Sequence, residues 1–129
     1  MKLDYDCVRS ILLELEKKPR FDDDLRITPA PVEEIFSTLE RYSDGDILYC
    51  IETMKDAELI KANLQYGGGS FIMGYVSGIT YKGHELLDSI RDRKIWQRLK
   101  QLLSAAGATT FDIIIDVAKD IIKSNIRIN

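Results

Sequence analysis

Residues 60–76 carry the pattern that most restricts the fold of this chain. Apolar and polar residues alternate from Ile60 to Tyr66, the period of a strand with one buried face, and Phe71, Met73 and Tyr75 resume the alternation opposite Ile72, Gly74 and Val76. Between them, Gly67 to Ser70 supply residues that tolerate positive φ at a tight reversal. A phosphate-binding glycine loop would lie between a strand and a helix and would carry a lysine. The pattern therefore predicts a plain β-hairpin.

The segment from Ser43 to Leu59 is predicted to be a helix that runs directly into this hairpin. Ile47, Ile51 and Met54 fall on one side at about 3.6 residues per turn and form a stripe that we expect to be buried. The predicted outward side carries carboxylates and no Arg, Lys, Asn or Gln; its residues are Asp46, Tyr49, Cys50, Thr53 and Asp56, with Glu52 beside them.

Two further helices are predicted before this one. The first runs from about Asp4 to Lys18, where Pro19 ends it, and the second begins at Val32. Residues 21–31 between them are polar and irregular, so we expect a solvated loop in which residues 25–28 supply a short first strand. The three consecutive acids at residues 22–24 lack the spaced oxygens and the glycine turn of a calcium loop.

Helix, short strand, two helices and a hairpin follow one another in the order of a winged helix. We therefore predict an α+β, helix-rich fold, a winged helix-turn-helix with a β-hairpin wing and a C-terminal helical extension. Residues 1–92 are expected to form the winged-helix domain, and residues 93–129 an extension packed on it or on a second subunit, as a single compact unit.

A long helix is predicted from about Lys82, with Thr80 as its cap, to Gly107. Its apolar stripe changes sides: Leu86, Leu87 and Ile90 lie on one side and Ile95, Trp96, Leu99, Leu102 and Leu103 on the other. The helix therefore bends near residues 91–94 or passes to a second packing partner. Residues 82–103 hold six basic and three acidic residues, and Arg91, Lys94 and Arg98 would share a face. A solvated helix face and a phosphate contact both explain this patch.

The last helix is predicted to begin at Thr109 or Thr110 and is strongly apolar. Such a stripe must be covered, either by the preceding helix in a helical hairpin or by a second subunit, and the sequence leaves both open. The predicted oligomer-interface residues are Phe111, Ile114, Ile115, Ala118 and Ile122.

Composition argues for a cytoplasmic protein without catalytic, metal or cofactor chemistry. The net charge of −3 gives no global attraction to nucleic acid, and no apolar run approaches the roughly 20 residues that span a bilayer. His84 is the only histidine, so no nucleophilic triad is expected. Cys7 and Cys50 lack metal-ligand spacing; reduced thiols and a disulfide between them both remain open.

Several separated segments resemble a known family. They are residues 1–9, the stretch from Tyr42 to Ile60, the glycine-rich hairpin and, most clearly, residues 79–92 (ITYKGHELLDSIRD). They are similar to a bacterial and prophage family catalogued as domain of unknown function twenty-five thirteen, and the resemblance runs from Met1 to about Ser124. It implies a winged-helix-like fold and a phage or prophage setting, and no established activity or catalytic residues. Glu58 stands where the related segments usually have glycine.

Two functions are expected from these patterns. The first is a phage-associated factor that binds duplex DNA or regulates transcription and contacts phosphates through the wing and the basic helix, with Gln65, Ser70, Lys82, Arg91, Lys94 and Arg98 as DNA-binding residues. Against ordinary readout by the third helix, residues 32–56 hold seven acids and two bases. The alternative is a module that binds a host or phage protein through an acidic helix face, at Asp46, Tyr49, Thr53 and Asp56, or through the apolar C-terminal helix.

Overall fold

The computed structural model describes residues 1–107 and 109–128. Within them, the chain is mixed α+β and helix-rich, with six helices and one three-stranded antiparallel sheet, which confirms that part of the predicted fold class. The chain divides into two compact units, Met1–Gly83 and His84–Asn129, which we call the N-terminal and C-terminal units. The domain boundary predicted at residue 92 lies next to a break between two helices.

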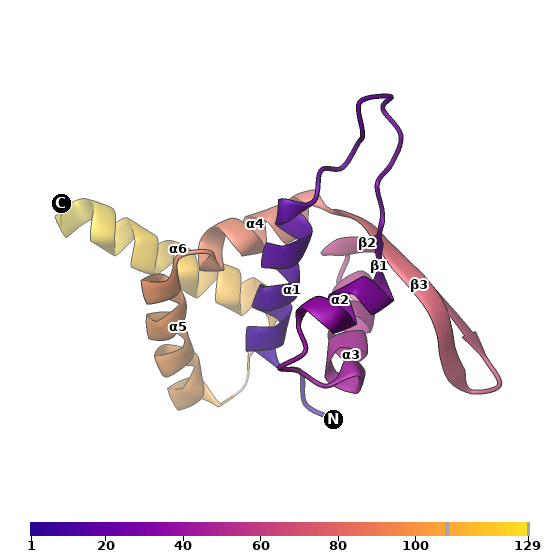
Figure 1. The fold of residues 1–129 in the computed structure, drawn as a ribbon. Coiled ribbons are helices and arrows are strands. Elements are labelled where there is room, and N and C mark those ends of the chain that lie inside the picture. The colour runs from indigo at the N-terminus through magenta and orange to yellow at the C-terminus, as the bar shows by residue number, and fades with distance from the viewer. Residues whose placement is uncertain (108, 129) are drawn as a thin grey trace. The chain divides into compact units, whose positions relative to one another are not determined.

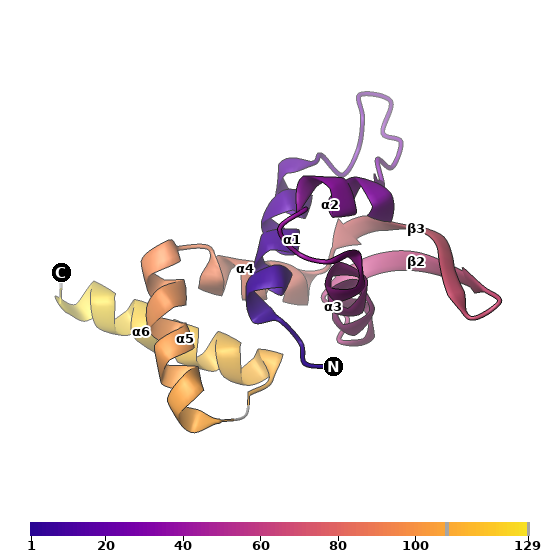
Figure 2. The ribbon, with the colours of Figure 1, turned by 60° about the horizontal axis from the view of Figure 1, so that its bottom comes forward.

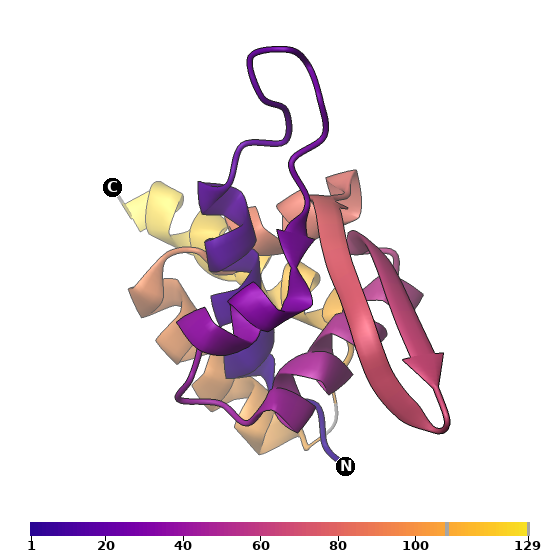
Figure 3. The ribbon, with the colours of Figure 1, turned by 45° about the vertical axis from the view of Figure 1, so that its right-hand side comes forward.

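The N-terminal unit contains the sheet. Its elements are α1 (Tyr5–Lys17), β1 (Ala30–Pro31), α2 (Val32–Thr38), α3 (Asp44–Asp56), β2 (Ile60–Gly67) and β3 (Ser70–Ile79). Strand β3 lies between β1 and β2 and pairs antiparallel with both. Helix α3 packs on α1, α2 and β2, and the tip of the β2–β3 hairpin extends beyond the helices (Figures 1 and 3).

The predicted hairpin is confirmed. Strand β2 ends at Gly67 and β3 begins at Ser70, and the two residues between them have φ angles of 60° and 80°. Positive φ at both central residues is the geometry of a two-residue type I′ turn, which glycine adopts without steric cost.

The first strand lies two residues beyond the predicted end at residue 28. Ala30 pairs with Val76 and Pro31 with Tyr75, whereas residues 25–28 belong to an exposed loop that stands out between α1 and β1 (Figure 1). The Asp22 carboxylate accepts hydrogen bonds from two backbone amides of this loop, and Leu25 takes a φ of 61°. That local turn makes an extended strand from residue 25 impossible. The loop is solvent-exposed, as expected.

Helix α3 begins and ends close to its predicted bounds. The Ser43 hydroxyl accepts a hydrogen bond from the Asp46 amide at 3.1 Å and caps the start. Ile47, Ile51 and Met54 are buried, as the periodicity predicts. After Ala57 the chain turns at Glu58, whose φ of 60° lies in the left-handed region. The Leu59 amide then donates to the Met54 carbonyl at 2.8 Å and closes the helix end.

The predicted long helix is two helices, α4 (Tyr81–Ile90) and α5 (Arg93–Ala106). The Asp92 carboxylate accepts a hydrogen bond from the Ile95 amide at 3.0 Å and starts the second helix. This break confirms the bend that the change of apolar side predicted. The predicted caps also form, because Thr80 accepts from the Gly83 amide and Thr110 from the Ile113 amide.

Helix α6 (Phe111–Ile128) completes the C-terminal unit and packs on α5, which it crosses in Figure 2. This is the helical hairpin that we expected as one way to cover the last helix. The largely buried apolar residues of α5 and α6 are Trp96, Leu99, Ile114, Ile115, Ala118 and Ile121. Leu102 was predicted to join this stripe, but 46% of its surface is exposed, because it lies at the edge of the side of α5 that faces solvent.

Candidate functional site

The predicted outward face of α3 is only partly open to solvent. Asp56 is exposed, whereas Asp46, Tyr49 and Thr53 are half-buried. The Thr53 hydroxyl is also engaged, since it donates to the Tyr49 carbonyl at 2.8 Å. The most accessible carboxylates towards the end of α3 are those of Glu52 and Asp56.

Cys50 was placed on this outward face, and that placement is wrong. It is 1% exposed, because α1 packs against this side of α3, and its thiol donates to the Asp4 carbonyl at 3.6 Å. The hydrogen bond between the Cys50 and Cys7 thiols, more than burial, raises the pKa of Cys7, and the same bond lowers the pKa of Cys50. Both cysteines are free thiols.

The hairpin meets α3 at Tyr66. Its phenol donates a hydrogen bond to the Glu52 carboxylate at 2.5 Å. Partial desolvation, that hydrogen bond and the charges of Glu52 and Asp56 raise the pKa of Tyr66 to about 12. The ring also packs edge-on against Phe71, with centroids 5.9 Å apart. Glu52, Asp56 and Tyr66 therefore form one continuous exposed area, which we call the α3–hairpin surface.

The tip of the hairpin offers no positive charge to a phosphate. Gln65 and Ser70, both predicted to contact DNA, are exposed near the tip, where Gln65 pairs with Met73 and Ser70 with Gly67. No Lys or Arg occurs from Ala62 to Ile79. These two side chains can therefore form hydrogen bonds, but they cannot release counterions from DNA.

Lys82 and Arg91 are already engaged with other residues. Lys82 is half-buried and already interacts with another residue, and the Arg91 guanidinium pairs with Asp88 at 2.9 Å. Arg91 precedes α5, so the expectation that it shares a helix face with Lys94 and Arg98 is wrong. The break at Asp92 interrupts the periodicity on which that expectation rested.

Lys94 and Arg98 are exposed one turn apart on α5, as the predicted phosphate contact requires. Gln97 and Gln101 are exposed on the same stripe, since residues three, four and seven positions apart share a helix face. Within the part of the chain that the structure describes, none of these four side chains makes a hydrogen bond or an ion pair. We call these four residues the α5 polar face.

Sequence reasoning missed Gln97, Gln101 and the neighbouring Arg93 as candidate site residues. The signal that could have found them is local: residues 93–111 contain four basic residues and no Asp or Glu. The range considered in the sequence analysis, residues 82–103, also contains three acidic residues, so the excess of basic residues is less evident there. A helix with bases and amides and without carboxylates attracts phosphates along its whole length.

The predicted oligomer-interface residues are mostly covered within the chain. Ile114, Ile115 and Ala118 are buried, whereas Phe111 and Ile122 are half-buried. Among residues 111–124 of α6, whose side chains the structure describes, Ile113 is the most exposed large apolar residue, at 44%.

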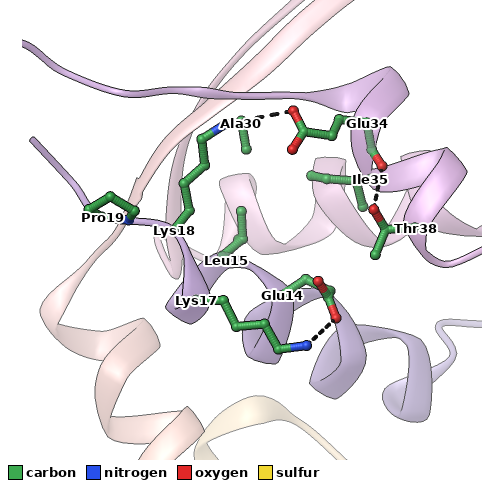
Figure 4. Close-up of a pocket in the computed structure, with 9 residues that line it drawn as sticks. All are labelled: Glu14, Leu15, Lys17, Lys18, Pro19, Ala30, Glu34, Ile35 and Thr38. Carbon is green, nitrogen blue, oxygen red and sulfur yellow. Dashed lines mark hydrogen bonds and ion pairs between the residues drawn. The ribbon is translucent and has the colours of Figure 1, made fainter. Parts of the chain in front are cut away.

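A pocket of about 330 Å³ lies between the end of α1, β1 and α2 (Figure 4). Apolar side chains such as Leu15 form its floor. Its rim carries two ion pairs, Lys18 to Glu34 at 3.6 Å and Lys17 to Glu14 at 2.8 Å. The pocket is lined by neither His nor Cys, and its charged groups neutralise one another. It is an amphipathic hollow whose charged side chains are paired with one another.

Other features of the described residues bear on the remaining predictions. His84 is exposed on α4. No three His, Cys, Asp or Glu side chains in the described ranges are grouped so that they could hold a metal ion. No helix in those ranges is long and apolar enough to cross a membrane.

Comparison with known proteins supports the resemblance of the separated segments. A curated relative from Haemophilus influenzae strain Rd, described as an uncharacterized protein, is 28% identical over 123 residues, which cover 95% of this chain and 96% of the relative. No solved structure matches the chain. The model of a family described as "Hypothetical protein (DUF2513)" matches residues 2–109. The chain belongs to this DUF2513 family.

Proposed function

We propose that this protein is a non-enzymatic, phage- or prophage-associated DNA-binding protein with a winged-helix-like N-terminal unit, and that it contacts DNA phosphates through α5. The winged-helix assignment is supported by the order α1-β1-α2-α3-β2-β3 and by the sheet order β1-β3-β2. Regulation of transcription is the role that such a fold suggests, which is an argument by analogy.

The observation that carries the proposal is the pair of exposed cations Lys94 and Arg98, which have no ion-pair partner among the described residues, on a helix without carboxylates. In a winged helix that reads DNA in the ordinary way, α3 enters the major groove. Here the exposed side of α3 carries Glu52 and Asp56, which phosphates repel. The hairpin provides no cation beyond Lys61 at its base. The distribution of charge therefore favours a DNA contact through α5 over one through α3.

A direct test is the titration of a fluorescent duplex of mixed sequence at low and moderate salt. Each phosphate that a cation neutralises releases counterions, so affinity should fall as salt rises. The double variant Lys94→Glu/Arg98→Glu should lose roughly tenfold or more of the low-salt affinity. Absence of binding by the wild type at low salt would overturn the proposal.

The matched control is Lys55→Glu/Lys61→Glu. It changes the net charge by the same amount, and its two lysines are exposed on α3 and β2, where ordinary winged-helix binding would need them. We expect it to weaken binding far less than the α5 variant. An equal or larger loss would place the contact at α3 and the hairpin and contradict the assignment to α5.

A second candidate function is a protein-interaction module, and the bond between Tyr66 and Glu52 favours it. This bond joins an exposed aromatic ring to exposed carboxylates on the α3–hairpin surface, and aromatic anchors beside charge suit a basic protein segment. Nuclease-treated lysate would be passed over wild type and over Glu52→Lys/Asp56→Lys. A partner of this surface should be retained by wild type and lost by that variant.

The control for this capture is Asp116→Lys/Asp120→Lys. These two carboxylates are also exposed and four residues apart on a helix, but they lie on α6. A partner lost equally from both variants would be responding to net charge, which would contradict a specific role for the α3–hairpin surface.

A further inference from the structure

The α5 polar face has an internal arrangement that a purely electrostatic contact does not require. Successive residues of a helix are rotated by about 100°. Projected on this basis, Gln97 and Gln101 lie towards the middle of the exposed side, next to Lys94. The guanidinium groups of Arg93 and Arg98 belong to its two opposite flanks, and both residues are exposed.

Helix α5 can present this face as a fixed surface. Trp96 and Leu99, on the opposite side, are 3% and 0% exposed, and α5 packs on α6. The Asp92 cap fixes the first turn. With 14 residues, the helix is about 21 Å long, enough to lie across several base pairs.

The side chains in the middle of the face match the edge of a base pair. A glutamine amide carries one acceptor and donors on the same planar group, so it can bond in bidentate fashion to N6 and N7 of adenine. The major groove of B-DNA is about 12 Å wide and admits a helix, with phosphates on both sides of it. The amides of Gln97 and Gln101 would therefore face the base edges. The guanidinium groups of Arg93 and Arg98 would face the phosphates on the two sides of the groove.

We propose that α5 is a recognition helix, which lies in the major groove of duplex DNA, reads adenine-containing base pairs through Gln97 and Gln101, and contacts the phosphates of the two strands through Arg93 and Arg98. This inference rests on the proposed function and names its target: duplex DNA of a particular sequence. A-form RNA is not the target, because its deep, narrow major groove cannot be read in this way.

The experiment is selection of binding sites from a random duplex DNA library, followed by affinity measurements on the enriched sequence and on single A·T to G·C replacements. The wild type should enrich one motif that contains adenine. The variant Gln97→Ala/Gln101→Ala should bind mixed-sequence duplex within about threefold of the wild type, because the cations remain. Its discrimination between the motif and the replaced sequences should fall by about 5- to 100-fold.

Alanine is the better helix former, so loss of the helix is not expected in this variant, and circular dichroism checks it. Asn63→Ala, at an exposed side-chain amide of the hairpin, should keep the motif and its discrimination. Binding of mixed duplex without an enriched motif would overturn this inference and leave the proposed function standing. Unchanged discrimination in the double variant, or equal competition by an RNA duplex of the same sequence, would do the same. No binding of any duplex at low salt would overturn both.

Discussion

The two units of this chain differ in charge and in the way they use polar side chains. The N-terminal unit holds 15 acidic and 10 basic residues, a net charge of −5. The C-terminal unit holds six acidic and eight basic residues, a net charge of +2. The overall charge of −3 conceals this opposition, and only the C-terminal unit attracts a polyanion.

Several polar side chains of the N-terminal unit are bonded to one another. Arg41 donates to the Ser10 hydroxyl at 2.6 Å, and the Tyr42 phenol lies 3.2 Å from the same oxygen. Tyr66 is bonded to Glu52 in the same unit. The α5 polar face of the C-terminal unit has no such bonds within the described residues. The element order of a winged helix is found in the N-terminal unit, whereas the polar side chains of α5 that make no such bonds belong to the C-terminal unit. The fold alone therefore does not indicate which unit binds a partner.

Stability should also have different origins in the two units. The C-terminal unit is built from helices alone, so burial of apolar side chains between them supplies most of its stabilisation. The N-terminal unit adds backbone constraints, such as close approaches at glycine and a residue with positive φ. Variants of the two kinds test this difference.

The largest effect is expected from Leu99→Ala in the C-terminal unit. Leu99 is fully buried, so truncation removes apolar contact and leaves a cavity, at a cost of about 3 kcal/mol in the free energy of unfolding. Leu102→Ala makes the same chemical change at a residue that is 46% exposed, and should cost less than about 0.5 kcal/mol. Urea unfolding, with hydrogen exchange on α5 and α6, measures both. Similar losses at the two positions would contradict the assigned orientation of α5.

Gly83→Ala should produce the next largest effect, in the N-terminal unit. A Cβ at this position would collide with the Leu59 carbonyl oxygen and with the Ile79 side chain. Relief requires movement of backbone, so we expect a loss of about 2 kcal/mol in the free energy of unfolding. Gly45→Ala is the control, because it also lies in the first turn of a helix, yet the nearest atom to its Cβ would be 4.0 Å away. Gly45→Ala should be neutral or slightly stabilising, and an equal loss there would show that the collision of the new Cβ with Leu59 and Ile79 is not the cause of the loss at Gly83.

Features that depend on neighbouring residues were predictable from the sequence. The glycine turn of the hairpin, the caps at Thr80 and Thr110 and the break between α4 and α5 follow from turn chemistry, capping and periodicity. The exposed pair Lys94 and Arg98, which we propose as phosphate contacts, was found in the same way, from charge and helix spacing.

Features that depend on distant packing were not predictable. Cys50 lies on the polar side of α3 by periodicity, but α1 covers that side and buries the thiol. The strand predicted at residues 25–28 failed for a local reason, because the Asp22 carboxylate closes a turn that the element order of a winged helix does not reveal. The apolar stripe of α6 was visible, but the sequence could not say that α5 would cover it.

A smaller, stabilising effect is expected from Glu58→Gly. Glu58, just beyond the C-cap of α3, has a φ of 60°, and an L-residue there costs about 1 kcal/mol that glycine avoids. Because glycine also loses more backbone entropy on folding, the net gain should be about 0.5 kcal/mol. Glu58→Ala removes the carboxylate but keeps the Cβ, so it should give no gain in urea unfolding. A gain from both variants would show that charge, and not backbone strain, is the cause.

The smallest effect is expected at Tyr66, because the pKa of its phenol responds to the negative charges of Glu52 and Asp56. Partial desolvation and the neighbouring Glu52 and Asp56 raise its pKa to about 12, above the value of about 10 for an unfolded tyrosine. A raised folded-state pKa contributes stability that is present below about pH 10 and is lost as the pH rises through the folded value. Between these values the stability of the wild type should therefore fall more steeply with pH than that of Tyr66→Phe.

The difference in absorbance near 295 nm between wild type and Tyr66→Phe follows the ionisation of this one phenol. It should titrate near pH 12, and Glu52→Gln should lower that midpoint, because it removes a charge that disfavours the phenolate. Titration near pH 10 in the wild type would mean that the carboxylates of α3 do not act on the hairpin. The carboxylates and the phenol of the α3–hairpin surface would then not influence one another. Only the net charges of the two units would distinguish this surface from the α5 polar face.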